Sequence, residues 1–233
     1  MIYLNPWFTE ALQRFQLNPS EEQLQQFHDY LTFLLDQNQV MNLTAITEPL
    51  EVYRKHFYDS LALSQVVDLN HKTLLDVGAG AGFPSVPCKI MIPSLKVHIV
   101  DSLQKRIAFL HQLFEKLHLS MVQATHQRVE DLSKEHQYDI VASRAVSRLP
   151  ILTELCLPFV RVGGFFLAMK SIHYQEELQE SKQAISLLGG QLERIFEYPL
   201  SETERHTILV IRKVKESPKQ YPRSFAKIKA SPL

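Results

Sequence analysis

The N-terminal part of the chain carries its hydrophobic residues at the spacing of an amphipathic helix. The recurring apolar positions are Leu24, Phe27, Tyr30, Leu31, Leu34 and Leu35. Ser20, just before them, can accept a hydrogen bond from the amides of the first turn, and Glu21 and Glu22 suit the positive end of a helix dipole. The pattern predicts a firm helix here, a polar break at Asn42–Ile46, and a second amphipathic stretch from about Pro49 to Val67.

From Thr73 onward, short hydrophobic segments alternate with helical patterns. The predicted strands are Thr73–Val77, Lys96–Asp101, about Ser120–Ala124, Tyr138–Ser143, Phe165–Lys170, about Leu192–Tyr198 and His206–Arg212. The main helical patterns between them are Lys105–Leu117, Leu149–Val160 and Gln175–Leu188. Such alternation is typical of a mostly parallel sheet covered by helices on both faces. The last two strands have no long helix between them, which favours an antiparallel hairpin at the edge of the sheet.

These patterns predict one doubly wound α/β domain with a sheet of seven strands. A chain of 233 residues with 45% hydrophobic and 21% charged residues can bury one substantial core. We expect a helical extension over residues 1–68 packed on that core, the core itself over residues 69–214, and a basic tail over residues 215–233.

Charge and cysteine content narrow the classes of function. Twenty-five Lys and Arg balance twenty-five Asp and Glu, so no global field attracts nucleic acid and any polyanion site must be local. Cys88 and Cys156 show neither a disulfide pattern nor metal-ligand spacing, so we expect no disulfide scaffold and no metal site. The chain start lacks a basic region followed by an apolar one, and no apolar run approaches the roughly 18 residues of a membrane helix. We expect a soluble cytoplasmic protein with no membrane partner.

An apolar strand ends in a loop with glycines at alternate positions, Gly78, Gly80 and Gly82. Glycine has no Cβ and tolerates positive φ, so such a loop lets a cofactor approach the backbone closely. The dinucleotide fingerprint G-x-G-x-x-G would need a glycine at the sixth position, where Phe83 stands. The observed spacing fits a cofactor that presents an amino-acid moiety and a sugar, as S-adenosylmethionine does; a tight turn with no ligand is the alternative.

The ends of later strands supply further candidate cofactor contacts. Asp101 ends the second strand, nineteen residues after the last loop glycine, and could accept both ribose hydroxyls of an adenosine, a device that dehydrogenases share. The Val129 amide and the Glu130 side chain could contact the adenine edge, although an ion pair with Arg128 at a helix start is an equal alternative. Arg144, after the fourth strand, could pair with the methionine carboxylate or a substrate phosphate; a surface salt bridge is the alternative.

Two absences limit the chemistry. No Asp-Pro-Pro-Tyr or Asn-Pro-Pro-Tyr segment follows the fourth strand, which disfavours methylation of an exocyclic amine. Cys156 lies in an apolar helical run with no neighbouring activator, which disfavours a cysteine nucleophile.

The C-terminal segment is locally basic. Its cations are Arg212, Lys213, Lys215, Lys219, Arg223, Lys227 and Lys229, against Glu216 alone. Tyr221 and Phe225 stand among them, and aromatic faces can stack on bases, which favours RNA binding. A solvated, disordered end is the alternative. Other cations expected around the mouth of the cofactor site are Lys105, Arg106, Arg144, Arg148 and Lys170.

The run Asp76–Pro87, with the letters D-V-G-A-G-A-G-F-P-S-V-P, resembles the D-V-G-x-G-x-G-F-P-G-x-P run of the RsmG (GidB) methyltransferases. The Phe-Pro continuation and the second proline are specific to this family. Further matches are Asn42–Ile46, His56-Phe57, Asp59-Ser60, Asp101-Ser102, Lys105-Arg106, Phe109-Leu110, Arg128–Glu130, Ser143–Ala145 and Gly163-Gly164 before Lys170. Together they span about Asn42 to Lys170, with a fainter match at Tyr221–Arg223.

The resemblance implies a class I S-adenosylmethionine methyltransferase, with a Rossmann-like fold and an antiparallel edge strand, that methylates N7 of a guanine in 16S ribosomal RNA. The implied target lies in a loop of the decoding region. The implied cofactor positions are Gly78, Gly80, Gly82, Phe83, Asp101, Ser102, Val129, Glu130 and Arg144. Ser85, Ser171 and the stretch Ser224–Ala226 stand where the family usually has glycines.

Guanine N7 carries no proton at neutral pH, so methyl transfer to it requires no general base. The enzyme must instead hold the base in line with the methyl group. Candidate positioning residues are Asn42, His56, Asp59, Lys170 and Arg223. Helix support is the alternative for Asp59, and core or capping roles are alternatives for His56 and Asn42.

The expected partner is 16S ribosomal RNA or the small ribosomal subunit, and we expect a monomer. Two other functions stay open from the sequence: methylation of another acceptor, and a non-catalytic ribosome-assembly factor of the same fold. A nicotinamide oxidoreductase is a more distant alternative.

Overall fold

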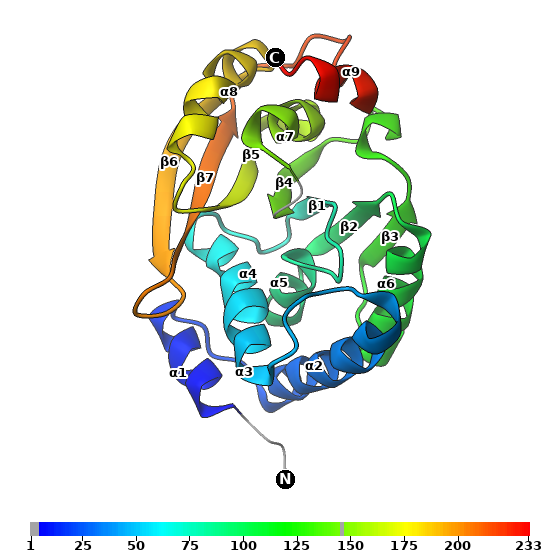
Figure 1. Ribbon diagram of the computed structural model, residues 1–233, viewed down its shortest axis with the longest axis vertical. Helices are drawn as coiled ribbons and strands as arrows, with labels where there is room; N and C mark the ends of the chain where they lie inside the picture. The colour runs from blue at the N-terminus through cyan, green and yellow to red at the C-terminus, as the bar shows by residue number, and fades with distance from the viewer. Residues whose placement is uncertain (1–4, 145–146) are drawn as a thin grey trace.

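The computed structural model describes residues 5–144 and 147–233, and within them seven strands form one sheet in the order β3-β2-β1-β4-β5-β7-β6. The strands are β1 (Thr73–Val77), β2 (Lys96–Asp101), β3 (Val122–His126), β4 (Tyr138–Arg144), β5 (Val160–Ser171), β6 (Gly190–Pro199) and β7 (Arg205–Lys213). Neighbouring strands from β3 to β5 pair in parallel, whereas β7 runs antiparallel to both β5 and β6 (Figure 1). The doubly wound fold and the antiparallel hairpin at the sheet edge are therefore confirmed. β6 is the outermost strand, and β7 is the strand whose direction is reversed.

Helices cover both faces of this sheet. The α-helices are α1 (Pro6–Arg14), α2 (Glu21–Met41), α3 (Pro49–Val52), α4 (Asp59–Leu61), α5 (Ser85–Met91), α6 (Gln104–Lys116), α7 (Leu149–Cys156), α8 (Gln175–Leu187) and α9 (Phe225–Ala230). Figure 1 shows α7, α8 and α9 grouped on one side of the sheet and α1 to α6 on the other. Each face has its own core, because successive strand side chains point in opposite directions: Leu74 belongs to the first and Leu75 to the second.

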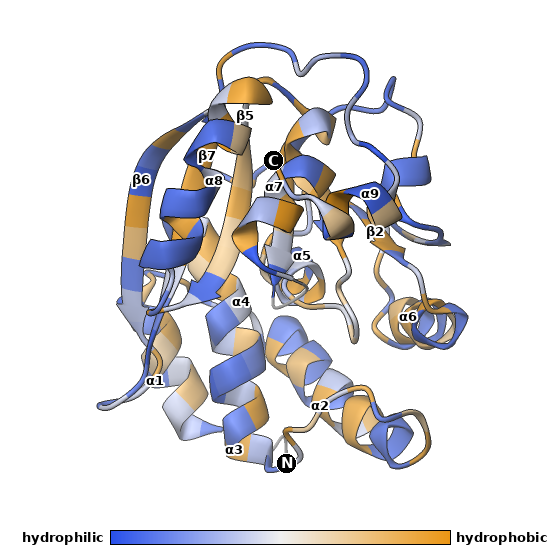
Figure 2. Cartoon of the chain, turned by 45° about the horizontal axis from the view of Figure 1, so that its top comes forward, coloured by the Kyte–Doolittle hydropathy of each residue, from blue (hydrophilic) through white to orange (hydrophobic). Residues whose placement is uncertain are grey.

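The long helices follow the predicted amphipathic patterns. α6 and α8 lie within one residue of their predicted limits, and Figure 2 shows hydrophobic and hydrophilic residues on different sides of both. At α2, Ser20 Oγ accepts the Gln23 amide at 3.2 Å while Gln23 Oε1 accepts the Ser20 amide at 2.8 Å. This reciprocal capping confirms the helix start expected at Ser20.

The second amphipathic stretch is helical from Pro49 to Gln65, but its type changes along the chain. A π-helical turn at Tyr53–Tyr58 separates α3 from α4, and a 3-10 turn follows at Ala62–Gln65. π-turns are rare and shift the side chains that follow them. This one carries His56 and leads directly into Asp59.

The predicted boundary between the helix at Leu149 and the next strand is wrong. α7 stops at Cys156, and β5 begins at Val160 instead of Phe165. Pro158 lies in the intervening 3-10 turn and has no amide hydrogen to continue an α-helix.

β3 also begins two residues later than predicted, at Val122. Met121 has a positive φ of 52° and turns the chain immediately before the strand. A non-glycine residue in this conformation cannot continue an extended strand.

Aromatic rings join the N-terminal helices to the glycine loop. Tyr30 of α2 donates its hydroxyl hydrogen to the Ala81 carbonyl at 2.5 Å, and its ring stacks on Phe83 with centroids 5.4 Å apart. Phe57 packs against both rings, at 5.0 and 6.0 Å. Residues 1–68 thus share a core with the sheet, as far as the structure describes them, and support the loop from behind.

The C-terminal segment folds back onto α7. Ile228 of α9 is fully buried in the second core, and Tyr221 and Phe225 pack against the same cluster. Lys213, counted above among the tail cations, is also buried and donates hydrogen bonds to the Leu157 and Leu188 carbonyls at 2.7 and 3.0 Å. It is therefore not a surface charge.

Within the described ranges, no helix combines the length and the apolar character needed to span a bilayer. Cys88 and Cys156 are both buried and unpaired. No cluster of metal-ligating side chains occurs among the residues the structure describes.

Candidate functional site

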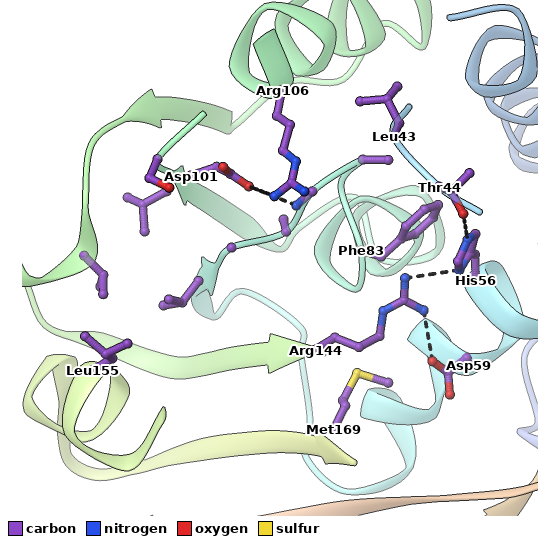
Figure 3. Close-up of a pocket in the computed structure, with 18 of the residues that line it drawn as sticks. Leu43, Thr44, His56, Asp59, Phe83, Asp101, Arg106, Arg144, Leu155 and Met169 are labelled. Atoms are coloured by element: carbon purple, nitrogen blue, oxygen red, sulfur yellow. Dashed lines mark hydrogen bonds and ion pairs between the residues drawn. The ribbon is translucent and has the colours of Figure 1, made fainter. Parts of the chain in front are cut away.

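A pocket of about 830 Å³ opens at the carboxyl ends of β1, β2 and β4, where doubly wound sheets bind their ligands. Figure 3 shows Asp101 and Arg106 at one side of it, Leu155 at another, and His56, Phe83, Asp59 and Arg144 grouped opposite. Its wall includes Gly78, Gly80, Phe83, Asp101, Ser102, Val129, Glu130 and Arg144. These expected cofactor residues therefore meet in one cavity.

The loop glycines differ in their surroundings. Gly80 has φ 60°, and a Cβ built there would meet no atom within 4 Å. Gly82 has φ 101°, and a Cβ there would lie 2.8 Å from the Tyr30 hydroxyl and from Val86 Cγ2. Gly80 thus faces open space in the pocket, whereas Gly82 lies outside the pocket wall and is required for the packing behind the loop.

Asp101 connects the end of β2 with the glycine loop. One carboxylate oxygen accepts the Leu103 amide at 2.9 Å, and the other accepts the Gly80 amide and Arg106 Nη1, both at 3.2 Å. Its side chain is nearly buried, while that of Arg106 is one-third exposed. Ser102 lines the pocket beside it.

Another part of the pocket wall comes from the segment after β3. Val129 begins a short 3-10 turn, Val129–Asp131, and lines the pocket together with Glu130. Arg128 Nη1 lies 3.9 Å from Glu130 Oε1, which is the ion pair named as the alternative for this segment. The pair does not remove either residue from the cavity wall.

Arg144 ends β4 and is held by three neighbours. Its Nη1 donates to the Lys55 carbonyl at 2.9 Å and to Asp59 Oδ2 at 3.0 Å, and its Nη2 lies 3.2 Å from His56 Nδ1. The guanidinium also lies 4.8 Å from the centroid of the Phe83 ring. Two of its five N–H groups, at Nε and Nη2, are left for a ligand.

His56 is an uncharged imidazole in this arrangement. Burial, and then the positive charge of Arg144, lower its pKa to about 3. Nδ1 also lies 3.1 Å from the Lys55 carbonyl oxygen, and Nε2 lies 2.8 Å from Thr44 Oγ1. The Arg144 guanidinium can only donate and the Lys55 carbonyl can only accept, so the tautomer of the neutral ring decides which of these two groups Nδ1 binds. The neutral ring stacks on Phe83 with centroids 4.5 Å apart.

Asp59 has both oxygens occupied. Oδ1 accepts hydrogen bonds from Tyr198 Oη at 2.6 Å and from His206 Nδ1 at 2.8 Å, while Oδ2 accepts from Arg144. Burial opposes its ionisation, but the hydrogen bond from His206 and the charge of Arg144 hold its pKa below the usual value. The carboxylate thus links α4, β4 and the β6–β7 hairpin, which agrees with the supporting role named for it as an alternative.

The remaining positioning candidates lie at different places. Lys170 lines the pocket, but its Nζ donates to the Ser147 carbonyl at 2.8 Å and to Glu177 Oε2 at 2.7 Å. Asn42 is the exposed C-cap of α2, in a left-handed conformation with φ 51°, and its neighbours line the pocket instead. Arg223 binds Glu154 outside the pocket wall.

The pocket also contains residues that the sequence pattern did not point to. Glu204 and His206 reach it from the β6–β7 hairpin, Leu155 from α7, and Met169 from β5. Their local sequence gives no signal of a site, because only strand order and helix packing bring them together. Phe225, expected to contact RNA, lines the cavity as well.

Comparison with solved structures agrees with the fold. TrmN from Thermus thermophilus has a TM-score of 0.56 at 15% identity, covering 68% of this chain and 49% of that chain. M. jannaschii TYW2, solved in complex with AdoMet, has a TM-score of 0.56 at 13% identity, covering 68% of this chain and 76% of that chain. At such identities the likeness establishes the architecture alone.

Curated relatives are far more similar. Ribosomal RNA small subunit methyltransferase G of Bacillus cytotoxicus is 54% identical, with 88% of each chain covered. Those of Listeria monocytogenes and Bacillus subtilis are 50% and 48% identical, covering 94% and 97% of this chain and 95% and 97% of theirs. A family model, GidB, described as rRNA small subunit methyltransferase G, matches residues 23–208. On this match and these identities, the chain belongs to the GidB family of ribosomal RNA small subunit methyltransferases.

Proposed function

We propose that the protein transfers a methyl group from S-adenosylmethionine to N7 of a guanine in 16S ribosomal RNA, in a loop of the decoding region. The observation that carries the cofactor assignment is the junction of the glycine loop with Asp101 inside the pocket, in a chain of this family. The target atom is proposed from the family resemblance. A ribosomal substrate would place the enzyme in the cytoplasm, where it would act as a monomer on 16S RNA or on the small subunit.

The pocket wall fits this cofactor. The open space at Gly80 and its positive φ leave room for a ligand against the backbone. Asp101 would accept the ribose hydroxyls, and the partly exposed Arg106 could move aside to free its oxygen. The Val129 amide and Glu130 would contact adenine, and the two remaining donors of Arg144 would bind the methionine carboxylate.

The reaction requires the chain to position the base and the methyl donor, and it requires no proton transfer. S-adenosylmethionine supplies an electrophilic methyl carbon; the N7 lone pair forms the new N–C bond while the C–S bond breaks. N7 has no proton to remove, and this agrees with a neutral His56 and a fully paired Asp59, neither of which is free to act as a base. Holding the base in line with the methyl group is the contribution left to the pocket.

Exposed lysines near the pocket would hold the RNA backbone. Lys219, Lys227 and Lys229 are exposed and lie on the segment that brings Phe225 to the cavity. Each phosphate that they neutralise would release counterions, so RNA affinity should fall with rising salt.

The test uses purified protein, a radiolabelled methyl donor and undermodified small ribosomal subunits. We expect label in 16S RNA, recovered as 7-methylguanosine after nuclease digestion and mapped to one position. Label in another nucleoside, or no label from a protein that binds the donor, would contradict the proposed acceptor.

A further inference from the structure

We propose that the C-terminal segment, residues 221–230, is part of the cofactor site, and that Phe225 forms the wall against which the adenine ring lies. The inference rests on the proposed use of an adenosine-containing methyl donor. From charge and aromatic residues alone, this segment was expected to bind RNA. We now assign it a role in cofactor binding.

Phe225 has the position that this role requires. It lines the pocket, and it packs against the cluster that contains Val129 and Leu155, both of which also line the pocket. Val129 is the residue whose amide is proposed to contact the adenine edge. The Arg128 guanidinium lies 5.1 Å from the centroid of the Phe225 ring, which restricts the ring from another side.

Two anchors fix the segment on either side of Phe225. On one side, Arg223 donates from its backbone amide and from Nε to Glu154 Oε1, both at 2.9 Å, and from Nη2 to Oε2 at 2.6 Å. Glu154 is fully buried on α7. On the other side, Ile228 is fully buried and lies three residues after Phe225, on the same face of α9.

This arrangement differs from that of a mobile RNA-binding arm. An ion pair to a buried carboxylate and a buried isoleucine hold the backbone, so the half-buried ring of Phe225 is presented to the pocket in a fixed place. A planar purine on such a wall gains stacking and dispersion contacts, whereas the exposed Lys227 on the same helix has no part in them.

The first experiment measures S-adenosylhomocysteine binding by calorimetry to wild type, Phe225→Ala, Phe225→Tyr and the control Lys182→Ala, at an exposed position of α8. We expect roughly ten-fold or greater weakening in Phe225→Ala, because removing an aromatic base contact has about this effect. Phe225→Tyr and Lys182→Ala should bind as the wild type does. Ligand-free melting temperatures identify a variant that has lost its fold.

A second measurement detects the contact between the ligand and position 225 directly, without relying on a loss of affinity. Phe225→Trp places a fluorophore at the proposed wall, and the native Trp7 packs on Tyr58 in the N-terminal helices, at 5.7 Å between ring centroids. We expect S-adenosylhomocysteine to change the emission of Phe225→Trp by more than it changes that of the wild type.

Wild-type affinity in Phe225→Ala together with an unresponsive Phe225→Trp would overturn the inference. If Phe225→Ala then bound ribosomal RNA less tightly, the segment would belong to the RNA site instead. Failure of the wild type to bind S-adenosylhomocysteine would contradict the proposed function itself, so the two failures are distinguishable.

Discussion

His56 is a buried imidazole beside a guanidinium, and its environment decides its protonation. Thr44 lies within hydrogen-bonding distance of one ring nitrogen and Arg144 and the Lys55 carbonyl of the other, and the pKa is lowered to about 3. A neutral ring can stack on Phe83 and accept from Arg144, whereas a charged ring would repel that residue. The residue expected to position substrate therefore also holds the shape of the pocket.

We predict that His56→Asn reduces the acid sensitivity of folding. The unfolded chain takes up a proton at this residue below about pH 6.5, and the folded chain does so only near its lowered pKa. This residue therefore makes the free energy of unfolding fall as the pH drops through that window, at about 1.4 kcal/mol per pH unit. The variant should lose this contribution to the pH dependence. Urea unfolding at about pH 7, 6 and 5 measures the free energy of unfolding at each pH.

The matched control is His111→Asn, on the exposed side of α6. It should keep the wild-type pH dependence. The same slope in His56→Asn as in the wild type would contradict a neutral buried His56.

Asp101 supports a prediction on ligand affinity. Asp101→Ala removes the carboxylate that binds the Gly80 amide and that is proposed to bind ribose. A hydrogen bond to a charged group contributes roughly 1.5–3 kcal/mol, so S-adenosylhomocysteine should bind about ten- to hundred-fold more weakly. Calorimetry measures this, with the exposed Asp36→Ala as control. Equal affinity in the Asp101 variant would remove that residue from the site.

At the scale of elements, the glycine loop lies between two different environments. Its front, at Gly80, faces the pocket, and its back, at Gly82, presses on α2 through Tyr30 and on α5 through Val86. The same residue type therefore leaves open space in the pocket at one position and permits close packing at the other.

Paired alanine substitutions should separate these two uses. Gly82→Ala adds a Cβ 2.8 Å from two packed atoms in a left-handed conformation, and we expect it to lower the free energy of unfolding by roughly 2–4 kcal/mol. Gly80→Ala meets no protein atom and should cost about 1 kcal/mol through its φ alone. Gly80→Ala should nevertheless weaken S-adenosylhomocysteine binding more than ten-fold. Urea unfolding and calorimetry report the two effects, and equal stability of the two variants would contradict the assignment.

At the scale of the whole molecule, the C-terminal segment is tied to α7 by one ion pair with a buried member. Arg223→Ala would leave the fully buried Glu154 carboxylate without its partner, and we expect a loss of about 3 kcal/mol in unfolding free energy. Arg223→Met combined with Glu154→Leu should recover most of it, because no buried charge is left.

Arg148→Ala is the control for that pair. Arg148 also contacts a glutamate, Glu180, at 2.8 Å, but both side chains are exposed, so less than about 1 kcal/mol should be lost. Equal losses in the two arginine variants would show that burial of Glu154 does not determine the effect.

Local patterns were sufficient for most of the fold. The limits of β1 and β2 agree with the prediction to the residue, and α6 and α8 agree to within one, since hydrophobic periodicity directly reflects which side of an element is buried. The prediction was wrong between α7 and β5, where Pro158 lies in a 3-10 turn that separates the two elements.

The partners of charged residues could not be predicted in the same way. Lys213 and Arg223 belong to one basic run, yet one caps two buried carbonyls and the other pairs with a buried carboxylate on α7. The distribution of charge along a sequence does not indicate which groups contact each charged side chain in the folded protein. The same holds for Asp59, whose partners Tyr198 and His206 are about 140 residues away.

The sequence by itself determined the doubly wound fold, the glycine loop and the candidate cofactor residues at the strand ends, which line one pocket, because these depend on periodicity and on short spacings within one βα unit. Only the tertiary structure decided that Asp59 supports Arg144, that the hairpin contributes His206, and that Phe225 reaches the pocket. These contacts join residues far apart in the chain, and they exist only after the sheet and both helical layers have packed together.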